Sequence, residues 1–156
     1  AACGTAYHAC MIAKYWFEKF TQIPTSIDIA SEYRYRKDTL NKNSIGIVVS
    51  QSGETMDTLE CLKKFKQNGL FTTSVVNVLN STIARESDYI LPSLAGSEIG
   101  VASTKAFTCQ LLVLACLAIS IGRENGIISN SDENEYVESI LNLPRLISNV
   151  LNKEEV

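Results

Sequence analysis

Three short polar turns carry the residues whose types and spacing could do chemistry. They read CGT at residues 3–5, SQSGET at residues 50–55 and GSEIGVAST at residues 96–104. Each lies beside an apolar run and ahead of a segment with helical character, which is where backbone N–H groups of α/β proteins bind anions. The sequence therefore indicates an anion site built from hydroxyls and backbone amides.

The middle turn is the most informative of the three. Ser50, Ser52 and Thr55 supply hydroxyl donors, and Gly53 allows the backbone to come close to a ligand. Together with the dipole of the following helix, these groups would suit a phosphate. The turn lacks the lysine of a GxxxxGK[ST] nucleotide loop, so a single phosphate monoester fits better than a nucleotide. The pattern leaves open an ordinary helix cap, in which the hydroxyls only satisfy backbone amides.

A serine hydrolase is an alternative interpretation of the same turn, with Ser52 as the nucleophile. The GxSxG motif of such enzymes requires a glycine two residues before the serine, where this chain has Ser50. It also requires a histidine base, and His8 is the single histidine of the chain. A lone histidine in a helix is more often packed or solvated, so we favour the phosphate site.

The two outer turns give weaker signals. Ser103 and Thr104 stand at a helix start, followed by Lys105, and could bind sugar hydroxyls. Another capping sequence would look the same. The first turn supplies Thr5 and is short and weak alone.

The segments between the turns predict an α/β layer fold. Short apolar runs alternate with longer helical ones, and glycine or asparagine stands at the joints. The run SIGIVVS is apolar and β-branched, as expected of a parallel strand buried on both faces. We expect four or five parallel strands, at the start of the chain (the tail of a strand) and at residues 25–30, 44–50, 71–78 and 89–94.

Helical patterns fill the spaces between these strands. The apolar residues of 56–65 recur at helical spacing, and Gly69 stands where a C-terminal cap belongs. For the last helix we expect Ser131 or Asp132 as the N-cap and a kink at Pro144. The other helices are expected at residues 6–20, 101–122 and 131–152.

Composition limits the partners and the number of domains. A chain of 156 residues is the size of one domain, and its net charge of -3 leaves no excess of Lys and Arg for a nucleic acid. Its five cysteines form no CxxC pair, so free thiols in a reducing cytoplasm are the simplest interpretation, and neither a metal nor a cofactor is expected. The chain does not begin with Met, which fits a piece of a longer protein.

One segment is long enough to be considered as a membrane span. Between Lys105 and Arg123 lie 17 uncharged residues, which reaches the lower limit for a spanning helix. Thr108, Gln110 and Ser120 interrupt it, and its flanks lack aromatic anchors. A buried core helix is therefore the favoured interpretation, and no membrane partner is expected.

The turns and their flanks together resemble one family. The segments ACGTAY, ASEYRYR, SQSGETMDTL, ARESDYIL and GSEIGVASTKAFTCQL resemble, in order, the first sugar-isomerase (SIS) domain of the glutamine:fructose-6-phosphate aminotransferases. The resemblance is specific from Ala2 to about Leu111, and the later helices match in placement more than in motif. It implies a single SIS domain over residues 1–156, with a three-layer, flavodoxin-like, five-stranded parallel sheet whose first strand is truncated.

The resemblance also implies a phosphosugar site when it is carried over residue by residue. The implied phosphate contacts are Thr5, Ser50, Gln51, Ser52 and Thr55, and the implied sugar contacts are Val101 and Ser103. The ligands would be fructose 6-phosphate and glucosamine 6-phosphate. In that family the full-length enzyme adds a glutaminase domain, which releases ammonia, and a second SIS domain, and it commonly forms a homodimer.

Two departures from the family pattern bear on activity. Ala6 stands where the family usually has a serine, which removes one candidate sugar contact. The family's catalytic lysine, glutamate and histidine belong to the second SIS domain, the C-terminal tail and a neighbouring subunit, so we expect no catalytic residue in this chain and no activity from it alone. A non-catalytic sugar-phosphate sensor and a related phosphosugar deglycase or isomerase are the alternatives.

Overall fold

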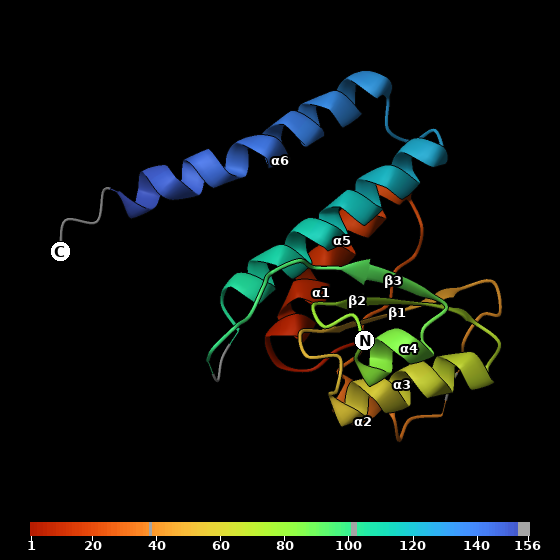
Figure 1. Ribbon diagram of the computed structural model, residues 1–156. Coiled ribbons are helices and arrows are strands. Elements are labelled where there is room, and N and C mark those ends of the chain that lie inside the picture. The colour runs from red at the N-terminus through yellow and green to blue at the C-terminus, as the bar shows by residue number, and fades with distance from the viewer. Residues whose placement is uncertain (38, 101–102, 153–156) are drawn as a thin grey trace.

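The computed structural model describes residues 1–37, 39–100 and 103–152, and a parallel sheet lies at its centre (Figure 1). Among these residues the sheet has three strands, β1 (Ile45–Ser50), β2 (Phe71–Val76) and β3 (Tyr89–Pro92), in the order β1-β2-β3. Ser50 pairs with Val76, and Val76 pairs with Pro92. The three strands therefore end at one edge of the sheet, and the polar turns after β1 and β3 start from that edge.

The predicted five strands are reproduced only in part, because the start of the chain and residues 25–30 form no named strand. Ala2 makes an isolated parallel bridge to Ile29, and the carbonyl oxygen of Ala1 accepts a hydrogen bond from β1 at 3.2 Å. Cys3 is already the N-cap of α1 (Gly4–Thr21), and within the described residues the pairing with residues 25–30 is limited to the bridge at Ile29.

Helices cover both faces of the sheet, with α1 and α5 on one face and α2, α3 and α4 on the other (Figure 1). Consecutive residues of a strand point to opposite faces. In β1, Val48 therefore packs in the core that contains Leu62 of α3, and Val49 packs in the core that contains Ala9 of α1. The described helices are α1 (Gly4–Thr21), α2 (Ala30–Tyr33), α3 (Met56–Gln67), α4 (Thr82–Glu86), α5 (Lys105–Glu124) and α6 (Asn130–Leu151).

The segment considered as a membrane span forms α5. Its length and composition alone would allow it to cross a membrane. In the structure it packs along α1, and Leu114 and Ala118 are buried in the core that the two helices share. Gly122 permits the close approach, because a Cβ at that position would lie 2.3 Å from the carbonyl oxygen of Phe20. One face of α5 is therefore buried as the core-helix interpretation predicts, whereas only 33% of its most apolar stretch is buried in the described structure.

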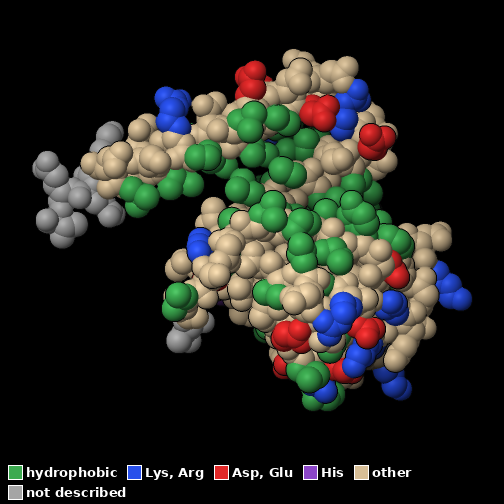
Figure 2. All heavy atoms as spheres, viewed as in Figure 1, with side chains coloured by type: hydrophobic (Ala, Val, Ile, Leu, Met, Phe, Trp, Pro, Cys, Tyr) green, Lys and Arg blue, Asp and Glu red, His purple; other side chains and the backbone are tan. Residues whose placement is uncertain are grey.

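The last helix, α6, extends away from the rest of the molecule (Figure 1). Its N-cap is Ser129, whose hydroxyl accepts a hydrogen bond from the N–H of Asp132 at 3.1 Å, so the prediction of Ser131 or Asp132 is wrong. The helix continues through Pro144, where the sequence predicts a kink. None of its described residues is buried, and hydrophobic side chains gather along it (Figure 2).

Candidate functional site

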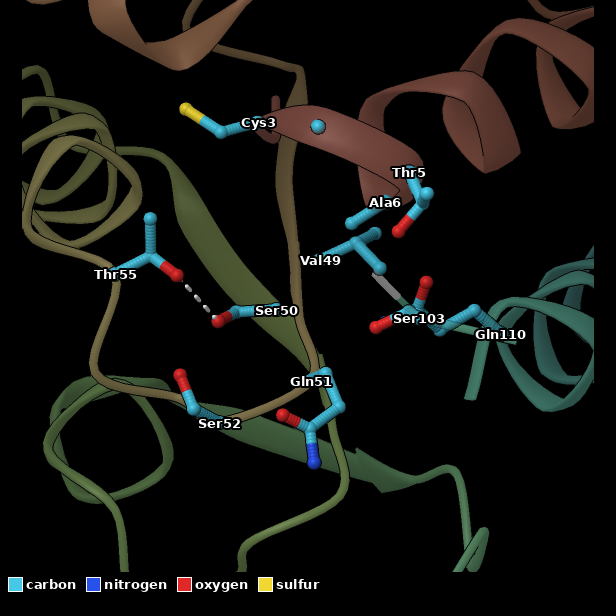
Figure 3. A pocket seen from close by; sticks show the side chains of 11 residues that line it. Cys3, Thr5, Ala6, Val49, Ser50, Gln51, Ser52, Thr55, Ser103 and Gln110 are labelled. Atoms are coloured by element: carbon cyan, nitrogen blue, oxygen red, sulfur yellow. Dashed lines mark hydrogen bonds between the residues drawn. The ribbon is translucent and has the colours of Figure 1, made fainter. Parts of the chain in front are cut away.

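A cavity of about 440 Å³ opens at the carboxyl end of β1 (Figure 3). The start of α1, the turn between β1 and α3, and the start of α5 surround it. Its size falls in the range of small-molecule sites. The described residues that line it are Cys3, Gly4, Thr5, Ala6, Val49, Ser50, Gln51, Ser52, Thr55, Ser103 and Gln110.

Hydroxyl groups organise the turn that follows β1. Ser50 Oγ accepts a hydrogen bond from the N–H of Gly53 at 3.1 Å and lies 3.1 Å from Thr55 Oγ1. Ser52 Oγ accepts a hydrogen bond from the N–H of Glu54 at 3.2 Å. Gly53 has a φ of +66°, in the left-handed region that favours glycine. The turn is thus held in one conformation by the groups that the sequence analysis assigned to phosphate.

Two helix N-termini at the cavity lack a side-chain cap. α1 begins after Cys3 and α3 begins after Thr55, and neither residue's side chain bonds the first turn of its helix. In contrast, Glu54 accepts a hydrogen bond from the N–H of Thr82 in α4 at 2.7 Å, and Glu98 accepts two at the start of α5, at 2.8 and 3.3 Å. Thr55 therefore does not cap α3, although the hydroxyls of Ser50 and Ser52 do accept backbone N–H groups of the turn. Helix N-termini without a side-chain cap, as at α1 and α3, are suited to an anion.

The two carboxylates fix the turns that border the cavity. The hydrogen bond from the N–H of Thr82 lowers the pKa of Glu54 below its ordinary value of 4.5, and the hydrogen bond from the N–H of Thr104 does the same for Glu98. Both side chains are therefore charged at neutral pH. A negative charge at a helix N-terminus is also favoured by the helix dipole, so each carboxylate stabilises the helix that it caps.

Asn77, just after β2, connects the turn that follows β1 to the turn that follows β3. Its backbone N–H donates to the carbonyl oxygen of Gln51 at 3.1 Å. Its side-chain amide donates to the carbonyl oxygen of Gly96 at 2.7 Å, and its Oδ1 accepts from the N–H of Ala95 at 2.8 Å. The sequence analysis gave Asn77 no role, because asparagine is common in any turn.

The wall of the cavity is neutral. None of the described residues that line it is a carboxylate, a lysine, an arginine or a histidine. A phosphate would therefore be bound by hydroxyls, backbone N–H groups and the dipoles of two helices. Within the described part of the chain, no group of three His, Cys, Asp or Glu side chains is placed to hold a metal ion. The wall can bind and orient a ligand, but it offers no carboxylate, lysine or histidine for proton transfer.

The structure brings most of the predicted site residues to this one cavity. Those that line it are Thr5, Ser50, Gln51, Ser52, Thr55 and Ser103. Val101 lies outside the described residues. Ala6 lines the cavity with a methyl group where the family usually has a hydroxyl. His8 is exposed on α1 and is not among the lining residues, so the hydrolase interpretation has no base in the described structure.

Two lining side chains were missed by the sequence analysis. Val49 lies next to Ser50 and belongs to the core shared with α1, so nothing in its type marks it as a site residue. Gln110 lies in α5 and was considered only as an interruption of an apolar run. A polar residue on the buried face of an apolar helix is the signal that could have identified it.

Comparison with known families matches the SIS domain to residues 1–120 of the 156. The chain belongs to the SIS-domain family. It is 56% identical over 153 residues to a glutamine–fructose-6-phosphate aminotransferase (isomerizing) of Bradyrhizobium diazoefficiens, and 56% identical over 154 residues to that of Brucella abortus. The matches cover 98% and 99% of this chain and 25% of each relative. The chain thus spans about a quarter of the length of these curated relatives.

Solved structures of SIS proteins have the same architecture. The C-terminal domain of the glucosamine-fructose-6-phosphate aminotransferase of Francisella tularensis aligns with a TM-score of 0.94 and 44% identity, over 97% of this chain and 43% of that one. A glucosamine-6-phosphate deaminase of Thermotoga maritima aligns with a TM-score of 0.75 and 26% identity, over 88% and 42%. By their names, the first is an aminotransferase of fructose 6-phosphate and the second is a deaminase of glucosamine 6-phosphate.

Proposed function

We propose that this chain is the first SIS domain of a glutamine:fructose-6-phosphate aminotransferase, in which it binds the phosphate of fructose 6-phosphate and of the product glucosamine 6-phosphate. The observation that carries the proposal is the cavity at the end of β1. There the hydroxyls of Ser50, Ser52 and Thr55 lie beside the uncapped N-termini of α1 and α3. The 56% identity to such aminotransferases over nearly the whole chain supports the same assignment.

The geometry implies that the two ends of the cavity bind different parts of the substrate. The phosphate is placed against the turn after β1, because the hydroxyl and N–H donors gather there. The sugar then extends toward the opposite wall, where Ser103 offers a hydroxyl (Figure 3). Binding one end of the substrate restricts the orientations of the other end, which is how a remote phosphate contributes to the rate of a reaction.

The chemical step needs groups that this wall does not supply. Amination of a ketose phosphate requires ring opening, formation of an imine and proton transfer between two adjacent carbons, and each step requires a positioned acid or base. We place those groups in other parts of the full-length enzyme. The role of this chain is therefore to bind and orient the phosphosugar.

The proposal extends to the longer protein. Because the curated relatives are about four times as long as this chain, we assign a glutaminase domain and a second SIS domain to the remainder. The pairing of Ile29 with Ala2, and of Ala1 with β1, supports a completed five-stranded sheet of flavodoxin-like order 2-1-3-4-5. The exposed apolar side chains along α6 (Figure 2) support a homodimer, and the five free cysteines support a cytoplasmic location.

Two measurements test the proposal. Titration of the 156-residue chain with fructose 6-phosphate, followed by NMR, should shift the amide signals of Ser52 and Thr55. The full-length protein should make glucosamine 6-phosphate from fructose 6-phosphate and glutamine, whereas the chain alone, supplied with ammonia, should make none. Absence of binding by both proteins contradicts the proposal, and binding without turnover by the full-length protein indicates a sensor instead.

The coding sequence that precedes this segment tests its place in the enzyme. A glutaminase domain that starts with a processed cysteine, joined directly to this chain, would agree with a first SIS domain. Another SIS domain in that place would contradict the assignment.

A deaminase of amino-sugar phosphates is the second candidate, because the glucosamine-6-phosphate deaminase of Thermotoga maritima has the same fold at 26% identity. The cavity would then bind glucosamine 6-phosphate as the substrate. Incubation of the full-length protein with glucosamine 6-phosphate alone, with ammonia as the readout, separates the two candidates. Release of ammonia without any use of glutamine would favour the deaminase.

A further inference from the structure

Gln110 lies on the wall of the cavity opposite the turn that follows β1. It is in the second turn of α5, and only 1% of its surface is exposed. Figure 3 shows it beside Val49 and Ser103, on the side of the cavity away from Ser52 and Thr55. A buried carboxamide thus contributes to the end of the cavity away from Ser52 and Thr55.

The side-chain oxygen of Gln110 has no hydrogen-bond partner among the described residues, although it is fully buried. Burial of an unpaired carbonyl oxygen costs free energy, and a leucine or methionine at this position would fill the same space without that cost. Buried polar groups without a partner in the protein are retained mainly where a ligand or a water molecule supplies the missing hydrogen bond. The unpaired oxygen therefore indicates a missing partner.

Other buried polar atoms without partners do not share this position. The hydroxyls of Thr58 and Ser74 are also unpaired among the described residues, but neither residue lines the cavity. The difference is that Gln110 is one of the residues that line the cavity. The terminal torsion of a glutamine side chain is broad, so its oxygen can turn toward the cavity at little cost.

We propose that Gln110 Oε1 accepts a hydrogen bond from a hydroxyl of the bound sugar, and that Gln110 is a substrate-binding residue that recognises the sugar rather than the phosphate. A phosphate at neutral pH has oxygens that accept hydrogen bonds, so the partner of a carbonyl oxygen must be an O–H or N–H group. The hydroxyls of a hexose phosphate supply such donors. This inference rests on the proposed function of the cavity as a phosphosugar site.

The test compares two ligands and two variants of the 156-residue chain. Gln110→Met keeps the volume of the side chain and removes its hydrogen-bonding groups. It should weaken binding of fructose 6-phosphate about fivefold, because one neutral hydrogen bond contributes about that factor to an affinity. Binding of inorganic phosphate should be unchanged. Thr55→Val is the matched control, because it should weaken both ligands. Affinities are measured by NMR titration, and the Tm of each variant is measured without ligand.

The Tm gives a readout that separates binding from structure. If Gln110 has no partner in the free protein, Gln110→Met should leave the Tm unchanged or raise it. A Tm lowered by several degrees, an equal loss for both ligands, or no loss for fructose 6-phosphate each overturns the role of Gln110. In each of these three outcomes, the proposed function still stands if the unaltered chain binds fructose 6-phosphate. Absence of that binding overturns the proposed function and, with it, this inference.

Discussion

The hydroxyl oxygens of Ser50 and Thr55 lie 3.1 Å apart across the turn that follows β1. One hydroxyl donates its hydrogen to the other, while Ser50 Oγ also accepts a hydrogen bond from the N–H of Gly53 at 3.1 Å. The turn is thus closed by neutral groups. A phosphate that enters the cavity can turn both hydroxyl hydrogens toward itself, so the donors are in place before the ligand binds.

The first prediction concerns the contribution of Thr55 to phosphate binding. Thr55→Val should weaken binding of fructose 6-phosphate about tenfold or more, because a hydrogen bond to a charged group is worth about 1.5–3 kcal/mol. The Tm should fall only slightly, because Thr55 makes no side-chain cap bond to α3 and loses only its hydrogen bond with Ser50, whose hydroxyl still accepts from the N–H of Gly53. Calorimetric or NMR titration gives the affinity.

The matched control for this variant is Thr25→Val. The hydroxyl of Thr25 is exposed and donates to the carbonyl oxygen of Ile23, and the residue does not line the cavity. This substitution should leave the affinity for fructose 6-phosphate unchanged. If Thr55→Val and Thr25→Val had similar affinities for fructose 6-phosphate, Thr55 would not bind the phosphate and its role would be purely structural.

The second prediction concerns Gly53. It has a φ of +66°, and a Cβ there would lie 1.9 Å from Ser81 Oγ and 2.5 Å from Ser81 Cβ. Gly53→Ala should therefore lower the free energy of unfolding by about 3 kcal/mol, from left-handed strain and a clash with a buried serine. Gly69→Ala is the control: its φ is +76° but no atom lies within 4 Å of the added Cβ, so about 1 kcal/mol is expected. If urea denaturation showed equal losses of unfolding free energy for Gly53→Ala and Gly69→Ala, the clash with Ser81 would be excluded.

The third prediction concerns the pH dependence that Glu98 confers. Its pKa is lowered from 4.5 by the hydrogen bond from the N–H of Thr104, so its stabilising effect is present above about pH 4.5 and is lost as the pH falls through the lower pKa of the folded state. The Tm of Glu98→Gln should therefore lie below that of the unaltered chain at neutral pH. The difference should shrink as the pH is lowered below 4.5. A difference that grows on acidification would show that Glu98 does not cap α5 as a carboxylate.

Local sequence signals predicted the elements whose formation depends on their own residues. The β-branched run before Ser50 becomes β1, and the helical spacing after Thr55 becomes α3, because burial of these apolar residues needs only that one sheet and one helix meet. Residues 25–30 have a similar strand pattern, yet they form a single bridge, at Ile29. The bridge joins Ile29 to Ala2, a residue far away in the sequence, and a local pattern does not report such a contact.

Long-range geometry also decided the details that the sequence left open. Ser129, Ser131 and Asp132 are all suitable N-caps, and in the structure the helix begins at Asn130, so Ser129 is the one used. Ser50, Ser52 and Thr55, which line the cavity, could be singled out because hydroxyls and a glycine in a turn have a chemical meaning by themselves. Gln110 was not found, because its meaning depends on the face of α5 that meets the cavity.

The fourth prediction concerns the contact between α1 and α5, which positions the two helix starts at the cavity. Gly122 lies within α5, where alanine would normally stabilise a helix by about 1 kcal/mol. Its added Cβ would lie 2.3 Å from the carbonyl oxygen of Phe20, a backbone atom that can move only if α1 moves. Gly122→Ala should therefore destabilise the chain by about 2 kcal/mol and lower its Tm by about 5 °C.

The matched control for Gly122 is Ser120→Ala, on the same helix. Ser120 is exposed, so this substitution tests helix propensity without the close contact, and it should leave the Tm unchanged or raise it slightly. If Gly122→Ala raised the Tm as well, propensity would outweigh packing and α1 would not be held at that distance. If the Tm falls as expected, the affinity for fructose 6-phosphate should fall with it, because Thr5 at the start of α1 and Gln110 in α5 line the same cavity.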